Sequence, residues 1–177
     1  MFSRFLFIVS FVSAFGLISC REKKNPNNSN VYSQDQITEK LVEANKAAIT
    51  AENNQIDKLI INSGWKSSET GTGLRYEILE KGKGQHTSVG KVVLYQYEVK
   101  LISGEIIYSS DKSGPKEFKI GSGGVESGLE EGILLLRVGD KARFIIPSYL
   151  AHGLSGDQDM IPAKATLIYT VKIIDLK

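Results

Sequence analysis

The side chains most capable of covalent or metal chemistry are few and scattered in this sequence. It contains two histidines, His86 and His152, and one cysteine, Cys20. These cannot supply the clustered ligands that a protein zinc site requires. Glu130 and Glu131 are adjacent, so on a helix they point in different directions and do not form an acid/base pair. We therefore expect no metal and no other cofactor, and a site whose chemistry is not covalent.

The glycine-rich and basic residues give no indication of a nucleotide or nucleic-acid site. Residues 71–73 and 121–124 lack the Lys-Ser/Thr ending of a phosphate-binding loop and are more simply turns. The formal net charge is +2, and Lys and Arg are scattered along the chain. A protein that binds the phosphate backbone usually gathers these residues into a basic stripe. We therefore expect no nucleic-acid partner.

The most informative part of the sequence is a helix-like segment followed by a strand-like one. Residues 127–136 predict a short helix, with Ser127 as N-cap and Glu130 completing a capping box. Residues 141–146 then alternate like a half-buried strand, with Ile145 on the face away from the core. A short helix laid against a sheet, with a loop above it, suits an apolar cleft for an extended peptide.

The rest of the chain predicts a single α+β domain of about a hundred residues. Strand-like alternation occurs at residues 74–78, 92–101, 106–108, 118–120 and 166–176. Strands of this kind, joined by short turns, predict an antiparallel sheet that curls around the short helix.

A long helix is expected in front of this domain. Residues 33–64 have helical periodicity, with Ser33 or Asp35 as the cap and Gly64 as the stop. The apolar residues recur at helical and heptad spacing, but they form a thin, alanine-rich stripe. We interpret the segment as a spacer helix. The alternative is one half of a weak homodimer seam over residues 37–61.

The N-terminus predicts a lipoprotein signal peptide over residues 1–19. Arg4 precedes an apolar run that is too short for a comfortable membrane span. The Leu-Ile-Ser-Cys sequence that ends at Cys20 resembles the lipobox of bacterial lipoproteins, and an ordinary signal peptide is the alternative. Residues 20–32 are polar and Asn-rich, which predicts a flexible tether. We therefore expect a cell-envelope protein, anchored to a bacterial membrane through lipid on Cys20.

Three segments resemble the FKBP family of macrolide-binding peptidyl-prolyl cis-trans isomerases. They are residues 103–110 (SGEIIYSS), 128–153 (GLEEGILLLRVGDKARFIIPSYLAHG) and 161–176 (IPAKATLIYTVKIIDL). The resemblance implies an FKBP-like curled antiparallel sheet wrapped around one short helix, over residues 68–177 with a core at 88–177. With the lipobox and the spacer helix, the layout most resembles the gliding-motility-associated isomerase lipoproteins of gliding bacteria.

The resemblance implies that the protein accelerates rotation about X–Pro bonds. Its partners would be proline-containing segments of exported proteins, and its catalytic domain would lie in the periplasm. The alternative is a non-catalytic, FKBP-like peptide-binding chaperone. That alternative arises because Tyr108 stands where the family has an Asp, Leu129 where it has a Trp, and His152 where it has a Tyr.

The resemblance also assigns the residues of the cleft. The catalytic residues it implies are Tyr97, Tyr108, Glu126, His152 and Tyr169. The substrate-binding walls it implies are Ile107, Val125, Leu129 and Ile161. The backbone N–H of Glu126 would receive a carbonyl of the substrate. From their strand pattern alone, Tyr97 and Tyr169 could be ordinary core residues, and His152 could be a surface residue of a loop.

Overall fold

The computed structural model describes residues 32–177. The predicted signal peptide, the lipid site at Cys20 and nearly all of the predicted tether therefore lie outside the described residues. Within the described part, no helix combines the length and the apolar character needed to cross a bilayer.

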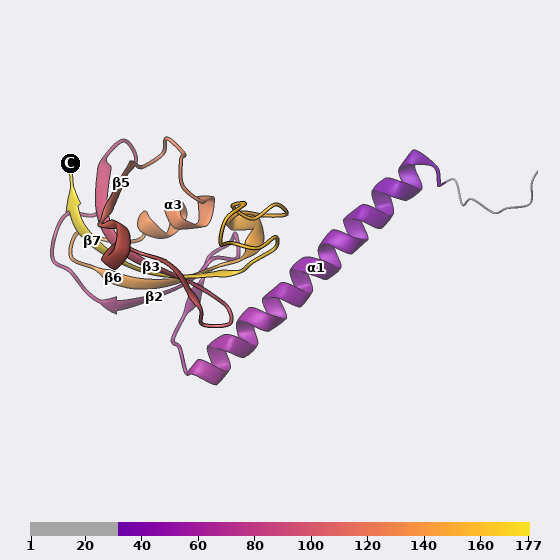
Figure 1. Cartoon of the computed structure of the whole chain (residues 1–177), viewed down its shortest axis with the longest axis horizontal. Coiled ribbons are helices and arrows are strands. Elements are labelled where there is room, and N and C mark those ends of the chain that lie inside the picture. Colours follow the sequence, from indigo (N-terminus) through magenta and orange to yellow (C-terminus); the bar gives the residue numbers. More distant parts are fainter. Residues whose placement is uncertain (1–31) are drawn as a thin grey trace, which may run out of the picture.

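An antiparallel sheet forms the centre of the fold and curves around a short helix, α3 (Figure 1). The strands are β1 (Ser68–Glu69), β2 (Arg75–Glu80), β3 (Val92–Leu101), β4 (Ile106–Ser109), β5 (Lys116–Lys119), β6 (Lys141–Ile146) and β7 (Leu167–Leu176). The helices are α1 (Gln34–Ser63), α2 (Ser110–Ser113) and α3 (Ser127–Ile133), with a 3-10 turn, η1 (Ser148–Leu150). The strand order is β1-β2-β6-β7-β3-β4, and β5 also pairs with β3. The predicted α+β class and the curled sheet are confirmed.

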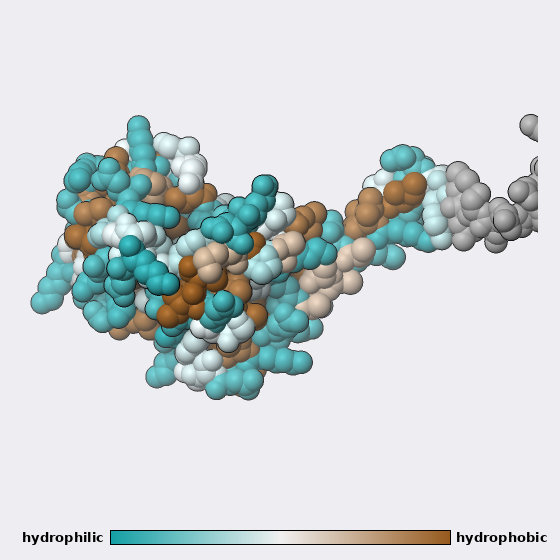
Figure 2. Space-filling view, viewed as in Figure 1, coloured by the Kyte–Doolittle hydropathy of each residue, from teal (hydrophilic) through white to brown (hydrophobic). Residues whose placement is uncertain are grey.

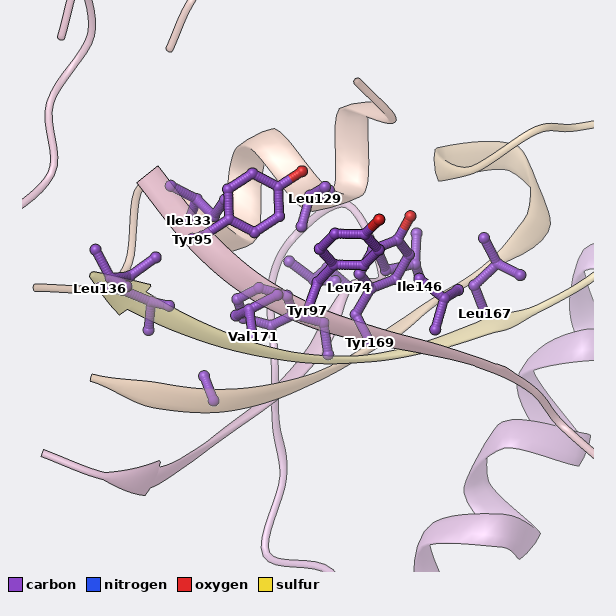
Figure 3. Close-up of a cluster of buried hydrophobic side chains, with 14 of the residues drawn as sticks. Leu74, Tyr95, Tyr97, Leu129, Ile133, Leu136, Ile146, Leu167, Tyr169 and Val171 are labelled. Atoms are coloured by element: carbon purple, nitrogen blue, oxygen red, sulfur yellow. The ribbon is translucent and has the colours of Figure 1, made fainter. Parts of the chain in front are cut away.

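The main hydrophobic core lies between α3 and the concave face of the sheet (Figure 3). Leu129 and Ile133 of α3 pack into it, together with Phe144 of β6. Gly132 allows the close approach, because a Cβ atom there would lie 2.7 Å from the Phe144 ring. The helix therefore rests directly on the strands and leaves its N-terminal end beside the sheet.

The predicted capping box of this helix is wrong. The N-cap is Glu126, and no side chain caps the helix. The Ser127 hydroxyl instead donates to the Leu150 carbonyl oxygen at 3.2 Å. The Glu130 carboxylate accepts from the N–H of Gly121 at 2.5 Å. Both side chains tie α3 to neighbouring loops, which offer better partners than the helix terminus.

The predicted ends of α1 are confirmed. Ser33 is its N-cap and forms a reciprocal capping box with Gln36. Gly64 ends the helix at a φ of +66°, a left-handed conformation that glycine adopts without strain. Of the two caps left open by the sequence, the structure uses Ser33 and not Asp35.

Part of the second face of the sheet, around Arg75, lies against the C-terminal half of α1. Ile145 was expected to face solvent, but it is buried. The register pairs Ile145 with both Arg75 and Ile168, so the three share one face, opposite the main core. Arg75 donates to Asn53 at 3.0 Å and to Asp57 at 3.3 Å, both on α1. The prediction for Ile145 is wrong because α1 lies on this face, where the sequence pattern indicated solvent.

The two halves of α1 differ in their surroundings. Ile56 is fully buried, whereas every residue from 34 to 51 is exposed. Figure 1 shows this half extending beyond the sheet. Its exposed apolar residues are Ile37, Leu41, Val42 and Ile49 (Figure 2). The helix is therefore only partly a spacer. Because Ile56 is buried within the chain, it is not available to the predicted dimer contact over residues 37–61. The dimer itself stays a prediction.

Candidate active site

A cavity of about 670 Å³ opens beside the N-terminal end of α3. Its floor and walls come from the concave face of β3, β4, β5 and β7, from the loop that leads into α3, and from the loop at residues 151–161. The lining residues are Tyr95, Tyr97, Val99, Tyr108, Lys116, Glu117, Phe118, Gly124, Val125, Glu126, Ala151, His152, Asp157, Ile161 and Tyr169.

Most of the site residues expected from the sequence meet at this cavity. They are Tyr97, Tyr108, Val125, Glu126, His152, Ile161 and Tyr169. Ile107 and Leu129 are not among its lining residues. Both are buried in the main core, where apolar packing against the sheet holds them beneath the cavity surface. The part that each residue plays in binding or catalysis stays a prediction.

The tyrosines of β3 and β7 belong to the core and to the cavity at once. Tyr97 and Tyr169 are 6% and 5% exposed, yet both line the cavity. Figure 3 shows their hydroxyl ends, with that of Tyr95, on the side of the strands that faces α3. The Tyr97 hydroxyl lies 2.7 Å from the Ser113 hydroxyl. The two interpretations left open by the sequence, core and cleft wall, are therefore compatible.

A carboxylate lies inside the cavity at the start of α3. Oε1 of Glu126 accepts from the Tyr169 hydroxyl at 2.6 Å and lies 2.9 Å from Nε2 of His152. Because a carboxylate only accepts, Nε2 carries the hydrogen of that bond. Burial, followed by the negative charge of Glu126, raises the pKa of Tyr169, so its hydroxyl remains a donor. These three residues form one hydrogen-bonded group, which we call the Glu126 cluster.

A second carboxylate reaches the cavity from the loop at residues 151–161. The Tyr108 hydroxyl donates to Oδ2 of Asp157 at 2.5 Å. Oδ1 of the same carboxylate accepts from the N–H groups of Asp159 and Ile161, at 2.9 and 2.7 Å. Burial opposes ionisation of Asp157, but these hydrogen bonds outweigh it and lower its pKa to about 2. Asp157 is therefore ionised at neutral pH.

The comparisons with known proteins settle the family. The model of the FKBP-type peptidyl-prolyl cis-trans isomerases matches residues 83–174, just over half of the chain. The chain belongs to this family. It is 34% identical over 140 residues to a probable FKBP-type peptidyl-prolyl cis-trans isomerase FkpA of Neisseria meningitidis, a match that covers 77% of this chain and 51% of that protein. The chain thus spans about half the length of this relative.

Two further comparisons agree with the assignment. FK506-binding protein 1 of Dictyostelium discoideum is 34% identical over 106 residues, which cover 59% of this chain and 99% of that protein. The crystal structure of FkpA from Escherichia coli superposes with a TM-score of 0.64 at 27% identity, over 83% of this chain and 74% of that chain. The isomerase fold predicted from the sequence is therefore confirmed.

Three features of this FKBP-type cleft were missed by sequence reasoning. Tyr95 lines the cavity, and its spacing of two residues from Tyr97 on one strand was a signal for this. Asp157 accepts a hydrogen bond from the Tyr108 hydroxyl, and nothing in the sequence of its polar loop indicated that this carboxylate would reach the cavity. The side chain of Glu126 enters the cavity, although only its backbone N–H had been assigned.

Proposed function

We propose that this chain is a peptidyl-prolyl cis-trans isomerase that acts on proline-containing segments of exported proteins. Family membership supports the activity. The observation that carries the proposal is the open cavity beside α3, lined by Tyr95, Tyr97, Tyr108 and Tyr169. These side chains surround a space that an extended peptide can enter without displacing the core.

The physical basis of catalysis is the loss of amide resonance at the transition state. Rotation about an X–Pro bond crosses a barrier of about 18–20 kcal/mol and takes tens of seconds or more without catalysis. The planar amide is more polar than the twisted one, so water stabilises the planar state more. A cleft that strips water from the bond therefore favours the twisted state relative to the planar one.

One hydrogen-bond donor completes this arrangement. Among the described residues, no acceptor is paired with the backbone N–H of Glu126, which borders the cavity. A substrate carbonyl held by this N–H fixes one side of the bond while the other side turns. The other ring nitrogen of His152, Nδ1, has no partner within residues 32–177, and because Nε2 carries the hydrogen of the neutral ring, Nδ1 suits an acceptor role.

A peptidase-coupled assay on a short Leu-Pro peptide tests the activity directly. The cis-to-trans rate constant is expected to rise in proportion to the concentration of added protein. A rate that stays at the uncatalysed value across that concentration range contradicts the proposal.

The second candidate function is a non-catalytic peptide-binding chaperone. The polar Glu126 cluster favours it, because a charged group inside the cleft makes the cleft less dry than the rotation mechanism requires. Peptide binding without any acceleration of X–Pro exchange would support this candidate. A large acceleration would exclude it as the whole function.

We further propose that the domain is held at a bacterial membrane by lipid on Cys20 and faces the periplasm. The lipobox-like sequence around Cys20 supports this, and one lipidated cysteine with two or more chains anchors a protein stably. Labelling with a palmitate analogue tests it: the natural chain is expected to take up label, and Cys20→Ala to take up none. Label on both chains contradicts the assignment.

Two finer proposals rest on the resemblance and on α1. A role in gliding motility follows from the resemblance alone, and deletion of the coding sequence in a gliding host would test it.

A weak homodimer through the exposed residues 37–49 of α1 is supported by their apolar stripe. Sedimentation at high concentration tests the dimer, and a monomer there would contradict it.

A further inference from the structure

The cleft carries two carboxylates that form no ion pair with a lysine or an arginine of the described chain. Asp157 is bound by a tyrosine hydroxyl and two backbone N–H groups, all of them neutral donors. Glu126 is bound by a tyrosine hydroxyl and by His152. No ion pair in residues 32–177 joins either carboxylate to a lysine or an arginine.

The other charged residues of the cavity lie at its exposed rim. Lys116 is exposed, and its Nζ lies 5.0 Å from the centroid of the Tyr97 ring. Its neighbour Glu117 is also exposed and pairs with Lys177 at 3.6 Å. This pairing leaves Lys116 as the one cavity-lining cation of the rim without an ion-pair partner in the described chain, and solvent screens its charge because the side chain is exposed. A bound peptide therefore meets two carboxylates, Glu126 and Asp157, inside the cleft and one solvent-screened cation, Lys116, at its rim.

One oxygen of Glu126 is left open to the cavity. Both hydrogen bonds of this carboxylate use Oε1, and Oε2 has no partner among the described residues. No buried side-chain oxygen in the described chain lacks a partner, so Oε2 remains accessible to solvent or ligand. The Glu126 cluster thus holds the carboxylate at the cavity wall and leaves one accessible acceptor oxygen on it.

We propose that the Glu126 carboxylate determines the sequence preference of the cleft, which selects X–Pro segments with a lysine or an arginine next to the proline. The inference rests on the proposed function and names its substrate class. Two unit charges about 7 Å apart in a partly solvated cleft change affinity by about three- to tenfold. Asp157 adds to the same field from the opposite wall.

Three peptides that differ only in the residue before proline, Lys, Leu or Glu, test the preference. For the natural chain we expect kcat/KM to decrease in the order Lys, Leu, Glu, with about a tenfold ratio or more between Lys and Glu at low salt. The ratio is expected to shrink in 0.5 M NaCl, because salt screens the charges. Turnover of the Leu peptide with equal rates for Lys and Glu overturns the inference.

The same three peptides test the charge preference independently of whether the protein has isomerase activity. Should none of them be turned over, the proposed function fails, and the dissociation constants of the three peptides, measured by NMR titration, decide the preference. Tighter binding of the Lys peptide then supports the inference, and equal binding overturns it.

Charge-neutralising variants assign the preference to particular residues. Glu126→Gln keeps the side-chain length and an acceptor for Tyr169, so we expect the Lys/Glu ratio to fall about three- to tenfold. Asp157→Asn should also lower the Lys/Glu ratio. Glu105→Gln is the matched control, because Glu105 is exposed in the β3–β4 turn and does not line the cavity. An unchanged ratio in both cleft variants, or an equal fall in Glu105→Gln, overturns the proposal.

Discussion

At the scale of single residues, the cleft carries two carboxylates, those of Glu126 and Asp157, each bound by a tyrosine hydroxyl. The resemblance predicts that Tyr108 replaces an Asp of the family, and in the structure Tyr108 donates to the carboxylate of Asp157, from the loop at 151–161. The sequence placed Tyr108 at the cleft, and Tyr108 lines the cavity; its replacement of a family Asp stays a prediction. Sequence reasoning could not identify Asp157, since the contact spans residues that are far apart in the chain.

Tyr108→Phe is expected to raise the pKa of Asp157 from about 2 towards its ordinary value. A depressed carboxyl pKa stabilises the fold above the unfolded value and loses this effect as pH falls through the folded value. The natural chain should therefore lose stability between about pH 4 and pH 2, and the variant should lose less over that window. NMR titration of the Asp157 carboxyl, with urea unfolding at each pH, measures both; an unchanged Asp157 pKa would contradict the assigned contact.

Tyr169→Ala is expected to destabilise the protein by about 3–5 kcal/mol, because a buried aromatic ring is lost from the core. It should also lower the isomerase rate. Tyr169→Phe is the matched variant, which keeps the ring and removes only the bond to Glu126. We expect it to cost about 1 kcal/mol and to change the rate less. Chemical unfolding and the peptidase-coupled assay separate these effects, and an unchanged rate in Tyr169→Ala would remove Tyr169 from the site.

At the scale of elements, local sequence signals predicted α1 and the strands, but not how α1 docks. The cap at Ser33 and the stop at Gly64 are local features, and both were identified. The docking contacts are not local: Glu52 accepts from the Ser148 N–H at 2.6 Å and from the Thr166 hydroxyl at 2.6 Å. Ile145 shows the consequence, since its burial depends on a helix that periodicity alone does not place.

Glu52→Ala is expected to destabilise the protein by about 2–3 kcal/mol, because three hydrogen bonds to its carboxylate are lost. It should also lower the isomerase rate. The carbonyl of Ser148 accepts from the N–H groups of Ala151 and Gly153, which flank His152 in the cleft. Hydrogen exchange at Gly153 and urea unfolding measure the two effects.

Glu43→Ala is the control for this element. Glu43 lies on the exposed half of α1 and has no hydrogen bond to the domain in the described structure. We expect its stability and its exchange rates to match those of the natural chain. Equal effects of the two substitutions would mean that Glu52 does not position the loop.

At the scale of the whole molecule, a curled-sheet domain carries a long helix that is docked through its C-terminal part and exposed over residues 34–51. Residues 34–51 are all exposed, and Figure 1 shows the start of α1 leading away from the sheet, although residues 45–51 border a groove against the domain. The family pattern predicted the domain, because its motifs lie in the sheet and α3. The position of α1 follows from side-chain contacts between separate elements, which no single segment of sequence encodes.

Removal of residues 1–50 is expected to leave the isomerase rate on short peptides within about twofold of the natural value, because none of the described residues of this segment, 32–50, lines the cavity. Removal of residues 1–64 should instead destabilise the domain by at least about 3 kcal/mol, since it uncovers Ile145 and Ile168 and strips Arg75 of its α1 partners. Thermal unfolding of both truncations measures this. Equal stability of the two would contradict the docking of α1.

NMR exchange spectroscopy on a single Leu-Pro peptide tests the central claim most directly, because one experiment reports both binding and cis-trans exchange. We predict that a small fraction of added protein accelerates the exchange between the cis and trans signals, and that Tyr169→Ala greatly reduces this acceleration. Peptide signals that shift on binding while exchange stays at the uncatalysed rate would contradict the account and leave a cleft that holds proline segments without turning them.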